Sequence, residues 1–249
     1  MTEPAAASVP RGQRGISEAL REFTAEFPFE RGPILDFVLG VARGTPTDAS
    51  VLDLGAGNAP YRELFAHTRY QTSDWSQSLH SGALEADIIA PADALPVADA
   101  LFDLVLCTQV LEHVSEPSRV LDECRRVLVA GGRLAITVPL LWELHEQPHD
   151  YYRYTGAGLH HLLEKSGFQE IEIEPRSDGF SAVAQLMRNL GWGMGDADDG
   201  LTAHRIEARR LLQELADQFS MLAELDANRT MPLGYTALAV KPVSGAHAE

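Results

Sequence analysis

The densest group of side chains that could do chemistry lies at residues 142–155, which read Trp-Glu-Leu-His-Glu-Gln-Pro-His-Asp-Tyr-Tyr-Arg-Tyr-Thr. Two of them, His145 and His149, are candidates for a general base, because imidazole ordinarily changes its charge near neutral pH. Asp150 and Arg153 can form a buried network, and we expect them mainly to anchor the segment. The sequence therefore predicts that this segment orients a substrate and accepts a proton from it.

A second informative stretch, Val-Leu-Asp-Leu-Gly-Ala-Gly-Asn-Ala-Pro-Tyr, spans residues 51–61. Its apolar start, interrupted only by Asp53, is typical of a buried parallel strand. Gly55 and Gly57 let the backbone turn sharply and let a ligand approach closely. Pro60 suits the first turn of a helix, where its missing N–H is not needed. Strand, glycine turn and helix start together predict the nucleotide-binding corner of a doubly wound α/β sheet.

Two features distinguish this corner from a dinucleotide site. A dinucleotide fingerprint needs a third glycine, and Pro60 stands in its place. Asp53 is not part of that fingerprint, whereas a cofactor with a positively charged amino-acid end needs such a carboxylate nearby. The stretch resembles motif I of the class I S-adenosylmethionine-dependent methyltransferases. The resemblance implies S-adenosylmethionine as cofactor and S-adenosylhomocysteine as product, and it places Asp53, Gly55, Ala56 and Gly57 among the cofactor-binding residues.

Residues at the ends of two later strands extend this predicted cofactor site. Asp74 lies about 20 residues after the glycine turn, where a carboxylate can accept both ribose hydroxyls. Trp75 can lie against the adenine or pack on the protein. Residues 102–114 resemble the family's motif IV, F-D-x-V-x-x-x-x-V-L-E-H-V, and the resemblance implies that backbone atoms near Cys107 and Thr108 line the methionine arm.

The adenine is expected to meet the segment at residues 91–96, which resembles the family's D-x-x-x-L-P loop with a shorter spacing. We predict that the carboxylate of Asp93 accepts the adenine amino group and that Ala94 and Leu95 form an apolar wall over the ring. Asp87 is the competing acid, and Asp93 is preferred because it is nearer to that wall.

Glu112 and His113 have two interpretations. In relatives that act on quinone-type phenols, a glutamate at the position of Gln109 joins such a Glu-His pair to hold a divalent metal. The uncharged Gln109 weakens a site for a hard cation, so we predict no metal and expect the pair to cap or brace the next helix.

The hydrophobic pattern predicts the elements that position these residues. Strands are expected at 51–54, 70–74, 86–90, 101–107, 134–139, 169–174 and 234–240. Helices are expected near 16–27, from Pro33 to Val41, at 61–66, at 116–128 with its end at Gly131-Gly132, and at 158–165 behind a Thr155 cap. Two more are expected near 180–190 and along a stripe formed by Leu211, Leu215, Phe219, Leu222 and Leu225.

The family resemblance implies the fold class, a Rossmann-like doubly wound α/β sheet of seven strands in the order 3-2-1-4-5-7-6, with strand 7 antiparallel. We divide the chain into a disordered tail with N-terminal cap helices at 1–44 and a methyltransferase domain at 45–249. Residues 191–200 and the ends of the chain are expected to be flexible. The helical insertion at 175–232 is a lid, a homodimer interface through residues 201–227, or a unit docked on the sheet.

Composition narrows the function classes. The 249 residues carry a net charge of −16, which argues against a nucleic-acid partner because binding phosphates needs Lys and Arg. The sequence shows no signal-peptide pattern and no apolar run long enough to span a membrane. Its two cysteines, Cys107 and Cys124, form no CxxC motif, which fits a reducing compartment. We therefore expect a cytoplasmic protein.

The run His-Asp-Tyr-Tyr-Arg-Tyr-Thr at 149–155 resembles a segment from a branch of bacterial methyltransferases, many of them encoded near sugar and cell-envelope genes. The resemblance implies methyl transfer to a small-molecule or sugar acceptor, and we favour O-methylation with His145 or His149 as general base. N- or C-methylation is the first alternative. A nicotinamide-dependent oxidoreductase and a non-catalytic cofactor-binding scaffold are the others.

Overall fold

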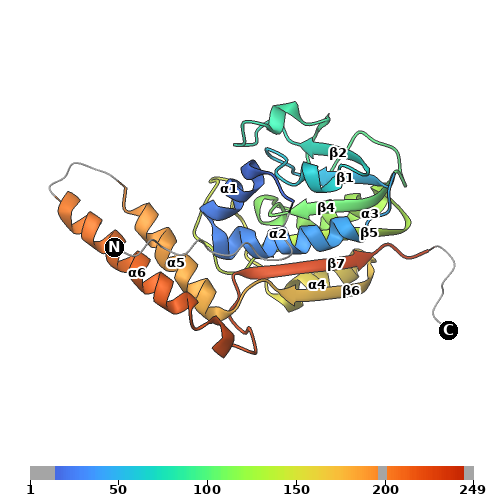
Figure 1. Ribbon diagram of the computed structural model, residues 1–249. Coiled ribbons are helices and arrows are strands. Elements are labelled where there is room, and N and C mark those ends of the chain that lie inside the picture. The colour runs from blue at the N-terminus through green and yellow to red at the C-terminus, as the bar shows by residue number, and fades with distance from the viewer. Residues whose placement is uncertain (1–14, 196–200, 244–249) are drawn as a thin grey trace.

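The computed structural model describes residues 15–195 and 201–243, and its centre is one sheet of seven strands in the order β3-β2-β1-β4-β5-β7-β6 (Figure 1). Strand β7 runs antiparallel to both of its neighbours, whereas the pairs among β1 to β5 are parallel. The expected fold class is therefore confirmed. The strands are β1 Ser50–Leu54, β2 Arg69–Asp74, β3 Ile88–Ile89, β4 Phe102–Thr108, β5 Leu128–Pro139, β6 Gln169–Pro175 and β7 Gly234–Val240.

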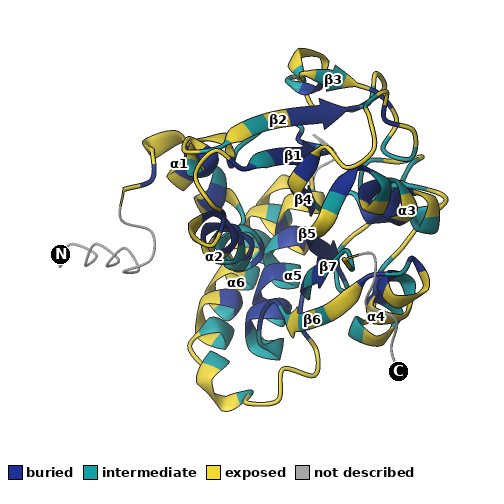
Figure 2. Cartoon of the chain, turned by 90° about the vertical axis from the view of Figure 1, so that its right-hand side faces the viewer, coloured by how far each residue is buried: buried dark blue, intermediate teal, exposed yellow. Residues whose placement is uncertain are grey.

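Helices cover both faces of the sheet (Figure 2). The α-helices are α1 Glu18–Glu26, α2 Pro28–Arg43, α3 Pro117–Val127, α4 Gly156–Lys165, α5 Gly179–Gly193 and α6 Thr202–Ser220. Short 3₁₀ helices are η2 Arg62–Phe65, η3 Ala83–Glu85, η4 Leu111–His113 and η5 Ala223–Leu225. No described helix is both long and apolar enough to cross a bilayer.

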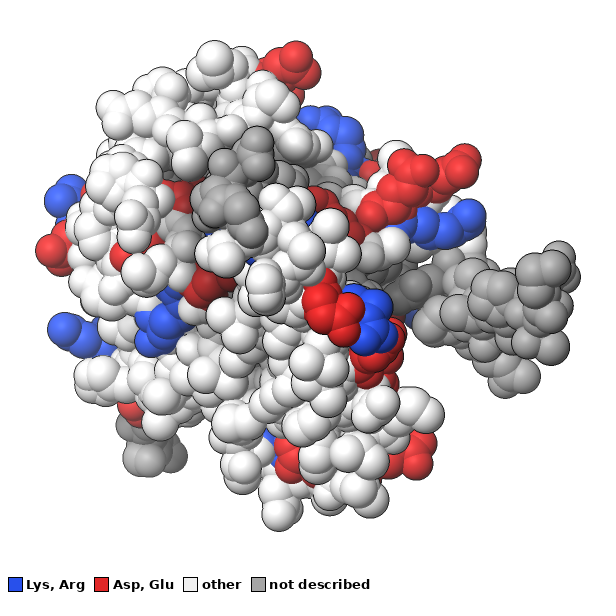
Figure 3. All heavy atoms as spheres, turned by 90° about the vertical axis from the view of Figure 1, so that its left-hand side faces the viewer, with Lys and Arg blue, Asp and Glu red and all other residues white. Residues whose placement is uncertain are grey.

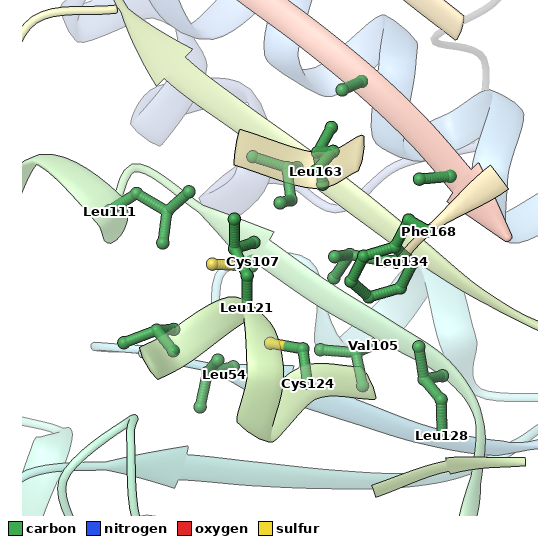
Figure 4. Packing of buried hydrophobic residues seen from close by; sticks show 14 of the residues in the cluster. Leu54, Val105, Cys107, Leu111, Leu121, Cys124, Leu128, Leu134, Leu163 and Phe168 are labelled. Atoms are coloured by element: carbon green, nitrogen blue, oxygen red, sulfur yellow. The ribbon is translucent and has the colours of Figure 1, made fainter. Parts of the chain in front are cut away.

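Alternate residues of the central strands supply two separate cores, as the two-residue period of a strand requires. In β4, Leu104 and Leu106 face α1 and α2, whereas Val105 and Cys107 face the core beneath α3 and α4. Figure 4 shows Cys107 and Cys124 within the second core, surrounded by leucine side chains. Both faces of β4 are therefore buried, which explains its nearly continuous apolar sequence.

Two helices precede the sheet as expected, but their boundary is different. The second helix begins at Pro28, so Pro33 lies inside it rather than at its start. Ser17 caps α1 by accepting a hydrogen bond from the backbone N–H of Leu20 at 3.2 Å. The predicted tail before these helices lies almost entirely outside the described residues.

Three other predicted elements were wrong in type or extent. The helix expected at 61–66 is only the 3₁₀ segment η2, and the expected strand at 86–90 pairs over just two residues. Helix α3 ends at Val127, because the next residue is already extended and pairs with Phe102 of β4. Gly131 and Gly132 therefore lie within β5, where the register with β4 shifts, rather than at a helix terminus.

Helices α5 and α6 form a hairpin that projects away from the sheet, on the left of Figure 1. The predicted stripe on the second helix was too long, because α6 ends at Ser220 and Leu225 lies in η5 with its side chain largely exposed. Ala216 is the buried residue of α6. Residues 196–200, part of the stretch expected to be flexible, lie outside the described residues, and residues 191–193 belong to α5.

Candidate functional site

A pocket of about 360 Å³ opens at the carboxyl ends of β1, β2 and β4, the edge at which open α/β sheets bind ligands. Four of the predicted cofactor residues line it: Gly55, Asp74, Trp75 and Asp93. The loop after β5 adds Glu146, His149 and Tyr151 on the opposite side. The predicted residues that do not belong to this lining are Asp53, Ala56, Gly57, Ala94, Leu95, Cys107, Thr108 and His145.

The glycine turn is held closed by Asp74. Its Oδ2 accepts the backbone N–H of Gly57 at 2.7 Å, and its Oδ1 accepts the N–H of Trp75 at 2.7 Å. Gly55 has a φ of +68°, and a Cβ there would lie 2.5 Å from a methyl group of Val110. The turn therefore requires glycine at position 55 for both conformation and space.

Asp93 and Asp87, the two acids considered for the adenine, have different surroundings. Oδ2 of Asp87 accepts hydrogen bonds from the backbone N–H and the hydroxyl of Thr72, at 2.8 and 3.0 Å, and these bonds lower the pKa of Asp87. Asp93 lies in the pocket wall and makes an ion pair with Arg119 at 3.4 Å. Asp87 is thus engaged at the edge of the sheet, which leaves Asp93 as the acid next to the pocket.

The predicted apolar wall beside Asp93 is formed by other residues than expected. Leu95 is buried in the core beneath α3, whereas Pro91 and Ala92 line the pocket. Cys107 is also fully buried in that core, and burial raises the pKa of its thiol. Cys107 can therefore contact a ligand only through its backbone, which is the kind of contact predicted for it from the sequence.

A family model described as a methyltransferase domain matches residues 52–136, which run from β1 into β5. This part of the chain is a methyltransferase domain of the class I S-adenosylmethionine-dependent type. This family uses S-adenosylmethionine as the methyl donor. The geometry of the methyltransferase agrees with that donor rather than with a dinucleotide, because the glycine turn leads into the single 3₁₀ turn η2 instead of a long helix whose N-terminus could bind a pyrophosphate.

Curated relatives of this methyltransferase include two kinds of O-methyltransferase. It is 28% identical over 175 residues to a malonyl-[acyl-carrier protein] O-methyltransferase of Methylococcus capsulatus, covering 61% of this chain and 64% of that one. It is 26% identical over 185 residues to a ubiquinone biosynthesis O-methyltransferase of Cereibacter sphaeroides, covering 64% and 69%. A rat thiol S-methyltransferase, TMT1B, is 27% identical over 161 residues, covering 53% and 65%. The chain thus spans just under two thirds of the Methylococcus and rat relatives.

Solved structures share its fold at lower sequence identity. The [4+2]-cyclase SpnF superimposes with a TM-score of 0.56 at 22% identity, covering 86% of this chain and 82% of that one. A phosphoethanolamine N-methyltransferase of Haemonchus contortus, solved with S-adenosylmethionine, gives a TM-score of 0.52 at 17% identity, covering 92% and 61%. These likenesses concern the fold alone.

Asp53 of the methyltransferase lies behind the glycine turn, on the α2 side of the sheet. Oδ2 of Asp53 accepts a short hydrogen bond from the hydroxyl of Tyr70, and no hydrogen-bond donor among the described residues meets Oδ1. Burial raises the pKa of Asp53 to about 7, although the Tyr70 hydrogen bond opposes this rise. The carboxyl group is therefore poised between its neutral and charged forms near neutral pH.

The loop that carries the two predicted bases is anchored by backbone and ionic contacts. The carbonyl of Glu112 accepts the backbone N–H groups of Tyr151 and Tyr152 at 2.8 and 3.3 Å. Asp150 pairs with Arg153 at 2.6 Å, and this contact lowers the pKa of Asp150 to about 2. The anchoring role expected for that pair is thus confirmed.

The two candidate bases occupy different places in the loop. His149 lines the pocket, with its ring edge-on to Trp75 at 5.0 Å and its Nδ1 3.2 Å from the hydroxyl of Tyr151. His145 contacts the ring of His113, with the centroids 4.7 Å apart. His149 therefore faces the pocket directly, whereas His145 meets it only through His113.

Glu112 and His113 do not cap α3, whose N-terminal residue has no side-chain cap. His113 instead donates from Nδ1 to the carbonyl of His149 at 2.8 Å, so it braces the loop. Glu112 is completely buried, and burial raises its pKa to about 8. Neither carboxylate oxygen of Glu112 has a hydrogen-bond partner among the described residues.

One interacting pair of pocket residues was missed by sequence reasoning. His80 and Glu146 both line the pocket and approach each other to 3.4 Å, so they connect the loop after β2 with the loop after β5. Glu146 also lies 3.9 Å from Nε2 of His113. Both missed residues lie in polar loops without periodicity, and only the tertiary fold brings them together.

Proposed function

We propose that this methyltransferase moves a methyl group from S-adenosylmethionine to a hydroxyl of a small-molecule or sugar acceptor, with His149 as the general base. The observation that carries the proposal is the position of His149 in the pocket wall, beside Tyr151 and Trp75. Within the described part of the chain, Nε2 of His149 has no hydrogen-bond partner. That nitrogen is therefore available to accept a proton from an acceptor hydroxyl.

The demands on the protein in this reaction are modest. Bound S-adenosylmethionine supplies an electrophilic methyl carbon on a sulfonium centre. The residues of the site then need to hold an acceptor oxygen in line with the methyl–sulfur bond and to accept its proton. Tyr151 supports the second task, because its hydroxyl oxygen can accept a hydrogen bond from the Nδ1–H group of His149 and so fix the tautomer in which Nε2 carries the free lone pair.

We assign the parts of the cofactor to residues in and beside the pocket wall. We assign the ribose hydroxyls to Asp74, whose two oxygens each accept one backbone N–H and keep lone pairs for further donors. Asp93 is proposed for the adenine amino group, and Gly55 and Gly57 for the close approach of the methionine end. Asp53 supports that end from behind through its charge. Trp75, which lines the pocket, stays proposed for contact with the adenine, and Ala56, Ala94 and the backbone of Cys107 and Thr108 stay proposed beside the cofactor.

The acceptor chemistry is supported by the names of two relatives. The malonyl-[acyl-carrier protein] and ubiquinone biosynthesis enzymes are both O-methyltransferases. N- or C-methylation is the alternative, and the mass and linkage of the product would distinguish the three. The short 3₁₀ turn after the glycine turn disfavours the nicotinamide-dependent oxidoreductase. A scaffold would bind S-adenosylhomocysteine without turning over any acceptor.

The test begins with calorimetric titration of S-adenosylhomocysteine and NADH, where we expect binding of the former alone. Methyl transfer from labelled S-adenosylmethionine to a panel of hydroxylated metabolites and sugars then identifies an acceptor. His149→Gln should lower kcat by about 100-fold or more, as expected for the loss of a general base, and should leave cofactor affinity unchanged. His161→Gln, on the exposed side of α4, is the matched control. An unchanged kcat in His149→Gln removes this residue as the base.

The compartment and the assembly are also part of the proposal. Cys107 and Cys124 are both free and buried thiols, which fits the reducing cytoplasm. On the face shown in Figure 3, Lys and Arg side chains are scattered among Asp and Glu, so this face offers no continuous basic surface for a nucleic acid. A homodimer through residues 201–227 stays a prediction, which light scattering of the purified protein would test.

A further inference from the structure

A cluster of potential metal ligands lies beside the pocket and is not used by the proposed methyl transfer. Glu112, His113 and His145 each offer one ligand atom, and these atoms all lie within 4.8 Å of one another. Two of the residues belong to η4, after β4, whereas His145 comes from the loop after β5. We propose that these three side chains form a binding site for a divalent transition-metal ion, with Glu146 as a fourth ligand.

The carboxylate of Glu112 is the strongest reason for the proposal. Its side chain is fully buried, and its two oxygens have no hydrogen-bond partner in the described part of the chain. A buried polar group without a partner is unfavourable, and native proteins ordinarily provide one. A cation held between Glu112 and the imidazoles would satisfy this carboxylate.

Both imidazoles are oriented for metal binding by acceptors on their Nδ1 side. The Nδ1 of His113 lies 2.8 Å from the carbonyl oxygen of His149, so it must be the protonated nitrogen. Nε2 then carries the lone pair, and it lies 3.9 Å from Oε1 of Glu112. In the same way, Nδ1 of His145 lies 3.2 Å from the carbonyl oxygen of Glu143 and 3.5 Å from Oδ2 of Asp150. Such outer contacts fix the tautomer and direction of metal-binding histidines.

The charges around the cluster suit a cation. Arg153 and Arg176 are the cations that act on Glu112, but each already has a close acidic partner. Arg153 pairs with Asp150 at 2.6 Å, and Arg176 pairs with a second buried glutamate, Glu30, at 2.7 Å. Glu146 adds a further carboxylate, with Oε2 3.9 Å from Nε2 of His113. Glu112 and Glu146 together can therefore balance the charge of a divalent ion.

The ligand set selects the kind of metal. Two imidazoles and one or two carboxylates suit zinc, cobalt, nickel or iron, whereas magnesium and calcium prefer oxygen ligands alone. Ligand atoms at about 2.1 Å from a shared ion lie roughly 3.4 Å apart in a tetrahedron, so those of the cluster need to approach by roughly 1 Å. The partly exposed loop that carries His145 and Glu146 can supply this movement.

This arrangement also explains why the sequence pointed away from a metal. In the relatives that hold a metal the third ligand is a glutamate at the position of Gln109, whereas the Gln109 side chain here donates from Nε2 to the hydroxyl of Thr137 at 2.9 Å. His145 takes the third position from a different loop, 36 residues after Gln109 in the chain. In this role His145 is a ligand rather than a base.

The test uses the purified full chain, stripped with EDTA and dialysed, and titrates Zn²⁺ by calorimetry and Co²⁺ by absorption. We expect one ion bound per chain and, for Co²⁺, the intense visible bands of a four-coordinate site. His145→Gln and Glu112→Gln should each weaken binding at least about tenfold, since loss of even an outer-shell partner has an effect of that size. His161→Gln, on the exposed side of α4, should bind like the wild type.

Glu112→Gln changes a fully buried residue, so circular dichroism must show that it remains folded. His145→Gln is the safer variant, because its position in the loop is partly exposed. The proposal is overturned if Zn²⁺ and Co²⁺ show no saturable binding, or if His145→Gln binds them as tightly as the wild type. Because these readouts need no acceptor and no turnover, they are independent of the proposed methyl transfer.

Discussion

Replacing Asp53 with asparagine should make the methyltransferase more stable at neutral and alkaline pH. The carboxyl group is fully buried, and burial raises its pKa from 3.8 to about 7. Such a group stabilises the fold fully at a pH below 3.8, and this contribution is lost as the pH rises through 7. Asparagine cannot ionise and can still accept the hydrogen bond from the hydroxyl of Tyr70. The variant therefore avoids the loss.

The size of the effect follows from the change in pKa. One unit of pKa corresponds to about 1.4 kcal/mol, so the charged form of Asp53 disfavours folding by about 4 kcal/mol above pH 7. At pH 4.5 the penalty on folding is only about 1 kcal/mol, because this pH lies only slightly above 3.8, the pKa of Asp53 in the unfolded chain. The advantage of Asp53→Asn in the free energy of unfolding should thus grow by about 3 kcal/mol between pH 4.5 and pH 8.

Urea denaturation of both proteins across this pH range measures the difference directly. Asp122→Asn, at an exposed position of α3, controls for the general effect of removing one negative charge and should show little dependence on pH. The same variant should bind S-adenosylhomocysteine more weakly than the wild type at pH 8, if the charge of Asp53 serves the amino-acid end of the cofactor. A variant that is less stable than the wild type at pH 8 would refute the reasoning.

Three further outcomes are expected from single contacts. His80→Gln should speed the release of S-adenosylhomocysteine in stopped-flow measurements, because it removes the bridge to Glu146 across the pocket. Glu146 raises the pKa of His80, so the slower release from the wild type should be seen at lower pH and should fade as the pH rises through this pKa. Arg176→Met should lower the free energy of unfolding by about 3–5 kcal/mol in urea, since it leaves Glu30 buried without its partner; an effect below about 1 kcal/mol would contradict this. Thr155→Ala should lower the thermal midpoint through the loss of about 1 kcal/mol of N-cap stabilisation, whereas Thr155→Ser should not.

The parts of the fold that could be predicted from sequence are those with local signals. The strands around Val51, Leu104 and Ile136 are short apolar runs, and glycines follow the first of them. The order of the strands came from the family resemblance rather than from these runs. Thr155 was recognised as a cap because a threonine before a helix has a local role.

Other boundaries were missed because tertiary contacts override local preference. Gly131 and Gly132 look like a helix end, yet both exchange backbone hydrogen bonds with Lys241, next to β7, and the pairing of β5 with β4 resumes at Arg133 after a register shift. The third strand has just two paired residues, Ile88 and Ile89, since it only extends the edge of β2. Neither outcome can be read from a window of sequence, because the competing hydrogen bonds come from distant strands.

The candidate site was predicted only in part for the same reason. Asp74 and Asp93 follow strands whose ends meet at one edge, so their position near the pocket could be expected. The hydrogen bond of Tyr70 to Asp53 depends on β1 and β2 being neighbours in register. The approach of His145 to Glu112 depends on how a loop folds back, and the spacing of the two residues along the chain does not contain that information.

The loop after β5 is therefore the segment that most affects the chemistry of this site. Its backbone is tied to Glu112, and its side chains provide His149 to the pocket and His145 to the metal cluster. The glycine turn and Asp74 form a separate unit, held together by hydrogen bonds that do not involve this loop. Because the hydrogen bonds of the glycine turn do not depend on this loop, substitutions at His145 or His149 should alter metal affinity or methyl transfer while leaving the binding of S-adenosylhomocysteine largely intact.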